Sequence, residues 1–348
     1  MTMMRAIIYD GKGGVNLKER NRPRIEDPTD AIVKIIYTTI CGTDLHILGG
    51  HVPSCKADRV LGHEGVGVVD VAGPGVKRFK EGDKVLISCI SSCATCKFCR
   101  KGMYSHCELG GWCLGHTTDG TQAEYTRIPL ADSSLYPVPE NVDLKALVML
   151  SDILPTGLEC GVLNGRVQPG CTVAIIGAGP VGLSALITAQ LYSPSMIICI
   201  DKDPSRLEVA KKLGATMTIE AGAGVENKVK DATNGMGVDT AIEAVGFPAT
   251  LELAQDLVAA GGTIANIGVH GESCNLKIDK LWGHNITLTT RLVDTVTTPM
   301  LLRLFASGNI RAKDLITHDF KFGDMEEAYS TFKSASKHNA LKMLISME

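Results

Sequence analysis

Four cysteines lie within fifteen residues, in the segment CATCKFCRKGMYSHC (93–107), at positions Cys93, Cys96, Cys99 and Cys107. The spacing C-x2-C-x2-C-x7-C is typical of four thiolates around a tetrahedral zinc ion, because short loops can bring the sulfur atoms to bonding distance. Disulfides would strain most pairings in so crowded a segment. Four protein ligands leave no open coordination position, so we interpret the cluster as a structural zinc site. Free or redox-active thiols are the alternative.

A second, catalytic metal site would need fewer protein ligands and donors elsewhere in the chain. Cys41 stands in ICGTDLH (40–46), directly after AIVKIIYTTI (31–40), whose alternating and β-branched residues predict a strand. His63 stands in LGHEGVGVVDVAG (61–73), at the glycine-rich entry to a further strand. A single buried cysteine or histidine is more often a core residue than a ligand, so these two become candidates only through their combination with other motifs.

A glycine turn predicts a site for a dinucleotide. CTVAIIGAGPVGLSALITAQL (171–191) reads as a strand, a turn with Gly177, Gly179 and Gly182, and a helix. A second strand, MIICID, follows and ends at Asp201. The glycines allow a tight turn, close approach of a pyrophosphate and packing of the helix on the strand. The start of the helix then meets the anion.

The elements around these motifs predict two kinds of domain. Strand and helix patterns alternate from about residue 155 to 290, including DTAIEAVG (239–246) and GTIANIGV (262–269), as expected of a doubly wound parallel sheet. Residues before about 154 are rich in strands and turns. The tail from about 291 has helical periodicity in MLLRLF and MEEAYSTF. The chain is therefore predicted to be an α/β protein.

Composition excludes several classes of function. The chain has 348 residues with 35 basic and 38 acidic ones, and it lacks a basic stripe, so we expect no nucleic-acid partner. Its start has no signal-peptide pattern, and its 12 cysteines therefore favour metal binding or buried thiols. Residues 167–200 carry no charge and could span a bilayer by length. Glycines and prolines interrupt them, so we expect a strand, a turn and a buried helix, and no membrane.

Together these motifs resemble the medium-chain zinc alcohol dehydrogenases over essentially the whole chain. Gly62-His63-Glu64, Gly67 and Gly73 fit the signature G-H-E-x2-G-x5-G, and CGTDLH, the four-cysteine lobe and GAGPVG occur in the family's order. LSDILPTG (150–157) is similar to the secondary-alcohol and formaldehyde dehydrogenase branches, in which an aspartate replaces the third zinc ligand. The resemblance implies a catalytic zinc on Cys41, His63 and Asp152, with Glu64 as a nearby or transient fourth ligand.

The resemblance also implies a domain plan. A GroES-like β-rich catalytic domain would occupy residues 1–154 and include the zinc lobe (93–107). A Rossmann cofactor domain would occupy 155–290, and a C-terminal segment, 291–348, would return to the catalytic domain.

The same resemblance assigns roles in the reaction. Zinc would stabilise an alkoxide, and hydride would pass to the nicotinamide. Thr43 and His46 match the family's proton relay, and Asp44 would accept a hydrogen bond from His63. Trp112 and Val269, with Thr43, would line the substrate pocket, although Trp112 could equally pack the lobe.

Cofactor contacts follow from the resemblance as well. Gly42 stands where classical relatives carry an arginine for the pyrophosphate, which leaves that role to the glycine turn and Lys342. The expected contacts are Thr156, Gly177, Gly179, Pro180, Val181, Gly182, Asp201, Lys202, Arg206, Val245, Ile267, Gly268, Val269, Leu292 and Lys342.

These residues predict a cytoplasmic, NAD-dependent zinc enzyme with two zinc ions per subunit, which acts on small alcohols, with secondary alcohols favoured, or on the matching ketones. Asp201 favours NAD over NADP because its carboxylate can bind the ribose hydroxyls and would repel a 2′-phosphate. A homotetramer is favoured over a dimer. A formaldehyde dehydrogenase-like enzyme, a polyol or amino-alcohol dehydrogenase, and a non-catalytic NAD-binding protein are the alternatives.

Overall fold

The computed structural model describes residues 2–347, which fold into two compact units. One unit contains Met1–Asp152 and Asp294–Glu348, and the other contains Ile153–Val293. The first is called the catalytic unit below and the second the cofactor unit. The sequence analysis placed the corresponding boundaries after residues 154 and 290.

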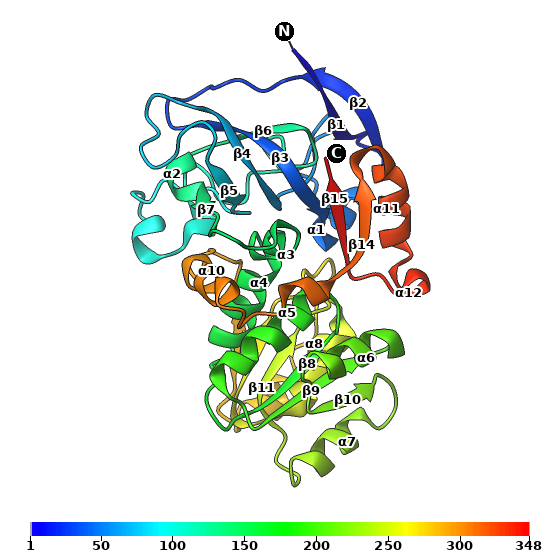
Figure 1. The fold of residues 1–348 in the computed structure, drawn as a ribbon. Coiled ribbons are helices and arrows are strands. Elements are labelled where there is room, and N and C mark those ends of the chain that lie inside the picture. Colours follow the sequence, from blue (N-terminus) through cyan, green and yellow to red (C-terminus); the bar gives the residue numbers. More distant parts are fainter. Residues whose placement is uncertain (1, 348) are drawn as a thin grey trace. The chain divides into compact units, whose positions relative to one another are not determined.

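The cofactor unit is built on a six-stranded parallel sheet with the order β10-β9-β8-β11-β12-β13 (Figure 1). The chain runs outward from β8 to one edge, returns to the centre at β11 and runs to the other edge. This reversal between β8 and β11 is the position at which doubly wound sheets bind their ligands. The strands are β8 (Thr172–Ile176), β9 (Met196–Asp201), β10 (Met217–Glu220), β11 (Val238–Glu243), β12 (Val258–Asn266) and β13 (Thr287–Thr290).

Helices connect these strands and bury the sheet. They are α4 (Ile153–Thr156), η4 (Gly157–Leu163, a π-helix), α5 (Pro180–Ala189), η5 (Gln190–Tyr192), α6 (Pro204–Lys212), α7 (Val225–Ala232), α8 (Pro248–Leu257) and α9 (Ile278–Leu281). Alternate residues of β9, Ile198 and Ile200, pack in one core with Val225 and Val229, which lie one helical turn apart on α7. The neutral stretch 167–200 thus forms a strand, a turn, a helix and a strand, as predicted.

Helix α6 shows how the sequence sets a local boundary. Asp203 is its N-cap, and its side chain accepts a hydrogen bond from the backbone N–H of Ser205 at 3.0 Å. Pro204 occupies the first helical turn, where its missing N–H costs no hydrogen bond. Asp203 therefore caps helix α6, whereas Asp201 is the last residue of β9.

The catalytic unit contains a seven-stranded sheet and a separate hairpin. The larger sheet has the order β14-β15-β3-β4-β5-β7, with β6 paired to β3, and is antiparallel except between β14 and β15. The strands are β1 (Met3–Tyr9), β2 (Val15–Asn21), β3 (Ala31–Ile40), β4 (Gly65–Ala72), β5 (Lys84–Ile87), β6 (Tyr125–Ile128), β7 (Leu135–Pro137), β14 (Ile316–Lys321) and β15 (Lys342–Ser346).

Short helices fill the loops of this unit, and the tail completes it. They are α1 (Gly42–Leu48), η1 (Cys99–Lys101), η2 (Tyr104–His106), α2 (Ala131–Ser134), α3 (Leu144–Leu147), η3 (Val148–Leu150), α10 (Thr298–Ala306), η6 (Ala312–Leu315), η7 (Phe322–Asp324), α11 (Met325–Lys333) and α12 (Ala335–His338). In Figure 1 the red strand β15 lies beside the blue strand β3, which agrees with their pairing. Phe322, Tyr329 and Met343 from the tail share a buried core with Ile7 and Ile40.

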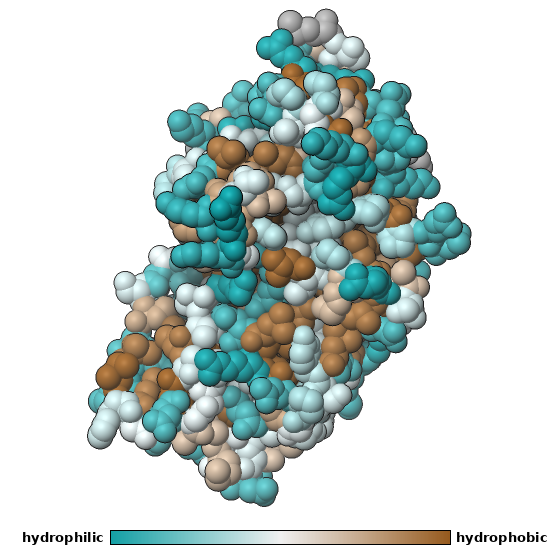
Figure 2. Space-filling model, turned by 90° about the vertical axis from the view of Figure 1, so that its left-hand side faces the viewer, coloured by the Kyte–Doolittle hydropathy of each residue, from teal (hydrophilic) through white to brown (hydrophobic). Residues whose placement is uncertain are grey.

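One apolar helical segment is a candidate membrane span by length, and its burial is that of a core segment. Leu144–Leu163 is long and apolar enough to cross a membrane, but 83% of its most apolar window is buried inside the protein, as in a core helix. On the face drawn in Figure 2, apolar patches alternate with hydrophilic side chains.

Candidate functional site

Cys41, His63 and Asp152 come together in the catalytic unit from three distant segments. One donor atom of each lies within 4.8 Å of the other two. Oδ2 of Asp152 lies 3.2 Å from Nε2 of His63 and 3.8 Å from Sγ of Cys41. Ligands of a tetrahedral zinc ion lie about 3.4–3.6 Å apart at ordinary bond lengths. The thiol, imidazole and carboxylate therefore fit a zinc ion and leave it one open position.

Local structure holds each of the three donors in place. Cys41 follows the last residue of β3 and is the N-cap of α1, and its N–H donates to Oδ2 of Asp44 at 2.8 Å. His63 follows Gly62, whose φ of +91° is a left-handed conformation that favours glycine. Ser151 fixes the position of its neighbour Asp152, because its hydroxyl accepts from the N–H of Gly65 at 3.1 Å.

Burial and charge act together on the ionisable groups around this site. Burial disfavours the imidazolium of His63, but contacts with Asp152 and Cys41 outweigh it and raise the pKa of His63 well above its ordinary value. Burial raises the pKa of Asp44. The predicted hydrogen bond from His63 to Asp44 is not formed: Asp44 accepts instead from Cys41 and from Gln122, at 3.1 Å, and its Oδ1 lacks a hydrogen-bond partner among residues 2–347.

Glu64 and Lys342 form a buried ion pair beside this site. Both side chains are 1% exposed, and the Lys342 ammonium donates to Oε2 of Glu64, which also accepts from the hydroxyl of Thr39. Burial opposes protonation of Lys342, but the charge of Glu64 outweighs it, so the pKa of Lys342 is raised. Oε2 of Glu64 is thus paired with Lys342, whereas its Oε1 is buried and lacks a hydrogen-bond partner among residues 2–347. The expected phosphate contact of Lys342 and the ligand role of Glu64 stay predictions.

Two of the predicted relay and pocket residues, Thr43 and Trp112, contact the same donors. The hydroxyl of Thr43 lies 3.8 Å from Sγ of Cys41. Trp112 is half-buried and meets His63 edge to face, with ring centroids 6.4 Å apart. His46 is on α1, and its Nδ1 lies 3.3 Å from Nδ1 of His51. Burial, and secondarily the charge of His51, lower the pKa of His46.

Several contributors were missed by the sequence analysis. Sγ of Cys89 lies 3.6 Å from Oδ1 of Asp152. Tyr329 donates to Gln122 at 2.8 Å, and this amide in turn supports Asp44. His116 stacks on Trp112 with centroids 4.4 Å apart. None of these residues belongs to a spaced motif, so only the packing identifies them.

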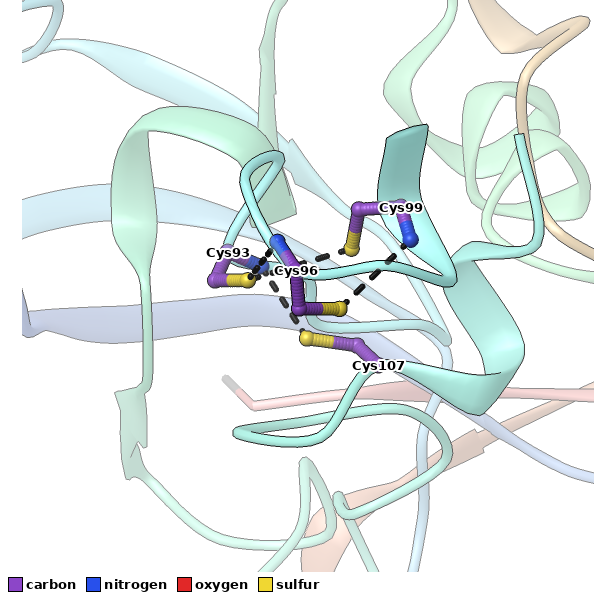
Figure 3. A group of neighbouring side chains, drawn as sticks. All are labelled: Cys93, Cys96, Cys99 and Cys107. Carbon is purple, nitrogen blue, oxygen red and sulfur yellow. Dashed lines mark hydrogen bonds between the residues drawn. The ribbon is translucent and has the colours of Figure 1, made fainter. Parts of the chain in front are cut away.

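The four cysteines of the lobe converge as predicted (Figure 3). Sulfur atoms of Cys93 and Cys99 are 3.9 Å apart, and all four donors lie within 4.8 Å of one another. Backbone N–H groups point at the sulfurs: Cys96 donates to Cys93 at 3.3 Å, and Cys93 donates to Cys107 at 3.2 Å. These donors favour thiolates, so the cluster fits a tetrahedral zinc ion.

The cysteines of the lobe differ in ease of ionisation. Burial opposes ionisation of Cys93, but the hydroxyl and N–H of Thr95 and the N–H of Cys96 outweigh it and lower its pKa to about 6. Burial raises the pKa of Cys99 to about 12. A cation in the centre would allow all four thiols to ionise together.

The glycine turn of the cofactor unit has the geometry of an anion site. Gly177 has φ +100°, and a Cβ on Gly182 would lie 1.9 Å from the carbonyl oxygen of Gly177, so neither position accepts a larger residue unchanged. Gly179 is the N-cap of α5, with Pro180 and Val181 in its first turn. The amide groups at the start of α5 therefore face a position that suits a phosphate.

Asp201 lies against this turn. Its side chain is largely buried, Oδ2 accepts from the N–H of Ala178 at 2.7 Å, and Oδ1 accepts from that of Asp203 at 2.8 Å. Arg206, one of the expected cofactor contacts, lies close to the turn. A Cβ on Gly179 would lie 3.7 Å from Nη1 of Arg206, so a guanidinium also reaches the turn.

The other expected cofactor contacts are spread over the ends of the strands. Val245 follows β11, Ile267, Gly268 and Val269 follow β12, Leu292 follows β13, and Thr156 ends α4. The strands end at Glu243 and Asn266, before the glycines that the sequence analysis included in them. Val245, Val269 and Leu292 are exposed by 36%, 54% and 46%, which leaves apolar surface for a ligand to cover.

Both halves of the chain match known protein families. Residues 27–140 match the family model described as alcohol dehydrogenase GroES-like domain, and residues 180–307 match that described as zinc-binding dehydrogenase.

Individual proteins are similar over the whole chain or most of it. Zinc dependent alcohol dehydrogenase 2 from Streptococcus pneumonia, solved in its apo form, is 50% identical with a TM-score of 0.95, over 99% of this chain and 98% of that one. An NADP-dependent isopropanol dehydrogenase of Thermoanaerobacter brockii is 32% identical over 95% of this chain and 96% of its own length. Zinc-type alcohol dehydrogenase B of Aspergillus flavus is 40% identical over 77% of this chain, and the match spans 64% of that relative's length.

The buried ion pair gives a prediction for stability. Lys342→Met should lower the free energy of unfolding by about 3–5 kcal/mol, because the Glu64 carboxylate then stays buried without its cation. Urea denaturation of the zinc-loaded protein at neutral pH measures the change. The control is the double variant Glu64→Gln, Lys342→Met, which removes both charges and should recover a large part of the loss. A single variant as stable as the wild type would contradict the prediction.

Proposed function

Since this chain belongs to the zinc-dependent medium-chain alcohol dehydrogenase family and is therefore an alcohol oxidoreductase, we propose that it transfers hydride between a small secondary alcohol and NAD. The observation that carries the proposal is the buried set of three unlike donors, Cys41, His63 and Asp152. A zinc ion held by them would polarise the oxygen of the substrate as a Lewis acid. The four-cysteine lobe would hold a second zinc ion, which only stabilises the structure.

The protein's own groups account for the proton. The Thr43 hydroxyl, 3.8 Å from the Cys41 thiol, is placed to accept the proton of an alcohol bound beside the donors. His46 is the base that releases this proton toward solvent. Its lowered pKa keeps the ring neutral to lower pH than an ordinary histidine, and a neutral ring is the form that accepts a proton.

The preference for a secondary alcohol rests on Asp152 and Trp112. LSDILPTG is similar to the secondary-alcohol branch, and the curated relative of Thermoanaerobacter brockii is named an isopropanol dehydrogenase. Trp112 stands edge to face with His63 and would form one wall of the pocket. LSDILPTG is also similar to the formaldehyde dehydrogenase branch, so Trp112 favours the secondary-alcohol reading over that one, and Asp152 favours it over the polyol and amino-alcohol readings.

NAD is proposed as the cofactor because of Asp201. Its carboxylate ends β9 against the glycine turn and is held there by two backbone N–H groups. A ribose hydroxyl can donate to it, whereas a 2′-phosphate would meet a negative charge. Arg206 reaches the same turn, and the isopropanol dehydrogenase relative is named NADP-dependent, so the preference needs a direct measurement.

We also propose that the enzyme is a cytoplasmic homo-oligomer, with a tetramer favoured. Strand β13 is an edge of the cofactor sheet, and Leu288 on it is 40% exposed. Trp282 and Ile278 nearby in the chain are 79% and 55% exposed. An open strand edge with large apolar side chains is suited to pair with a second copy of the chain.

Of the predictions that follow from this proposal, the first separates the two zinc sites. His63→Ala should abolish NAD reduction with 2-propanol while the protein stays folded and binds NAD, because a catalytic ligand is lost. Cys96→Ser should instead lower the yield and the melting temperature, because the lobe loses its metal. Sorbitol and formaldehyde serve as comparison substrates and should be poorer than 2-propanol. Metal analysis should find two zinc ions per chain, and a single zinc ion in fully active enzyme would contradict the scheme.

The second prediction concerns the relay. His46→Gln should slow alcohol oxidation mainly below about pH 7–8, by about 10²- to 10⁴-fold, because hydroxide is then too scarce to replace the imidazole. Added imidazole should restore part of the rate. His51→Gln is the control. Removing this neighbour should raise the pKa of His46, so the rate should begin to fall at a higher pH on acidification, while the rate at basic pH stays unchanged. An unaltered pH profile in His46→Gln would remove His46 from the relay.

The third prediction concerns the cofactor. The wild type should favour NAD over NADP in kcat/KM by at least about 1.4–2.8 kcal/mol, a ten- to hundredfold ratio. Asp201→Gly should lose most of this preference, because the repulsion of the 2′-phosphate disappears. Glu208→Ala, which removes an exposed acid that is not among the expected cofactor contacts, should keep it. Equal use of both cofactors by the wild type would reject the assignment.

A further inference from the structure

A cysteine, a histidine and a buried glutamate form a chain of contacts in the cofactor unit, apart from both metal clusters. Sγ of Cys274 lies 3.0 Å from Nδ1 of His270. On the other side of the ring, Nε2 lies 3.3 Å from Oε2 of Glu243. Glu243 ends β11, and His270 and Cys274 lie in the segment after β12.

The surroundings fix the tautomer of His270. Nε2 lies 2.8 Å from the side chain of Asn266. The amide nitrogen of Asn266 donates to the carbonyl of Gly268 at 3.0 Å, so its oxygen must be the atom that faces the ring. Two acceptors at Nε2 place the proton there, and Nδ1 is left as an acceptor for the thiol of Cys274.

Glu243 is positioned to stabilise a positive charge on this ring. Its side chain is fully buried, and Oε1 accepts from the N–H groups of Val245 and Gly246, both at 2.9 Å, and from the hydroxyl of Thr250 at 2.7 Å. These three donors hold the carboxyl group of Glu243 in place beside the ring. Oε2 has no hydrogen-bond donor in the described part of the chain, so its contact with His270 is electrostatic.

We propose that Cys274 is a reactive thiol, activated by His270 and Glu243, that forms mixed disulfides with low-molecular-weight disulfides. His270 takes the proton of the thiol, and the ion pair of thiolate and imidazolium is stabilised by the Glu243 carboxylate. The thiolate attacks one sulfur of the small disulfide: a bond forms between Sγ and that sulfur, and the disulfide bond breaks. The departing thiolate takes the proton from His270, so the exchange leaves the total number of disulfides unchanged.

Cys274 is partly exposed and so can be reached by such a molecule. The cofactor unit also contains a second partly exposed cysteine, Cys171, whose reactivity can be compared with that of Cys274. Burial raises the pKa of Cys171, and the other groups that act on it are backbone groups and the charge of Asp239. A carboxylate beside a thiol disfavours the thiolate, whereas an imidazolium favours it.

The exchange can be followed on the zinc-loaded enzyme with oxidised glutathione. Mass spectrometry of the digested protein measures mixed disulfide at each cysteine over time, from mildly acidic to basic pH. Cys274 should react at neutral pH at least about tenfold faster than Cys171, because only its thiolate is paired with an imidazolium. His270→Gln should remove this advantage and leave the rate at Cys171 unchanged.

The comparison of Cys274 with Cys171 in the wild-type protein is a test in itself, so the proposal can be rejected even if the variant folds poorly. Equal rates at Cys274 and Cys171, or a rate at Cys274 that falls with acid as steeply as that of Cys171, would overturn the proposal. A folded His270→Gln protein with unchanged reactivity at Cys274 would overturn it too. Cys171→Ser, which leaves the Cys274 rate intact, confirms that the two adducts are resolved.

Discussion

A thiol, an imidazole and a carboxylate must be held within bonding reach of one ion, although 111 residues separate Cys41 from Asp152 in the chain. No local motif can do this. Strands β3, β4 and β5 lie side by side and bring the segments that carry Cys41 and His63 together, and Ser151 joins the segment of Asp152 to them. The sheet of the catalytic unit therefore acts as the scaffold for its chemistry, and the loops at its strand ends supply the donors.

Behind the three donors lies a layer of buried polar groups that are hydrogen-bonded in chains. Tyr329, Gln122 and Asp44 form one chain that ends at the backbone of Cys41. Thr39, Glu64 and Lys342 form another. Polar groups without water are costly unless they are paired, so these chains restrict how the core can pack around the site. They also explain why a single buried lysine in the last strand bears on a site formed mainly by the first half of the chain.

The features that could be predicted best from the sequence are those formed by residues close together in the chain. The cysteine lobe needs only fifteen residues, and the glycine turn needs one strand and one helix. Asp152 was found through resemblance, because no spacing rule relates it to Cys41 and His63. The pairing of Lys342 with Glu64 joins positions 278 residues apart, and the order of His270, Glu243 and Cys274 depends on how two strand ends meet. Helix α1 was also not predicted, because seven residues give little periodicity.

The connectivity of the two units has a consequence for biosynthesis. Ile153–Val293 is continuous, so every residue of the cofactor unit is present once the ribosome has passed that point. The catalytic unit then still lacks β14 and β15, and with them the strand that pairs with residues 37–40 of β3 and the cation that faces Glu64. A nascent chain thus carries an unpaired stretch of β3 and an uncompensated acid until β15 emerges. Translation of β15, and not of the ligand-bearing segments, is the step that supplies both.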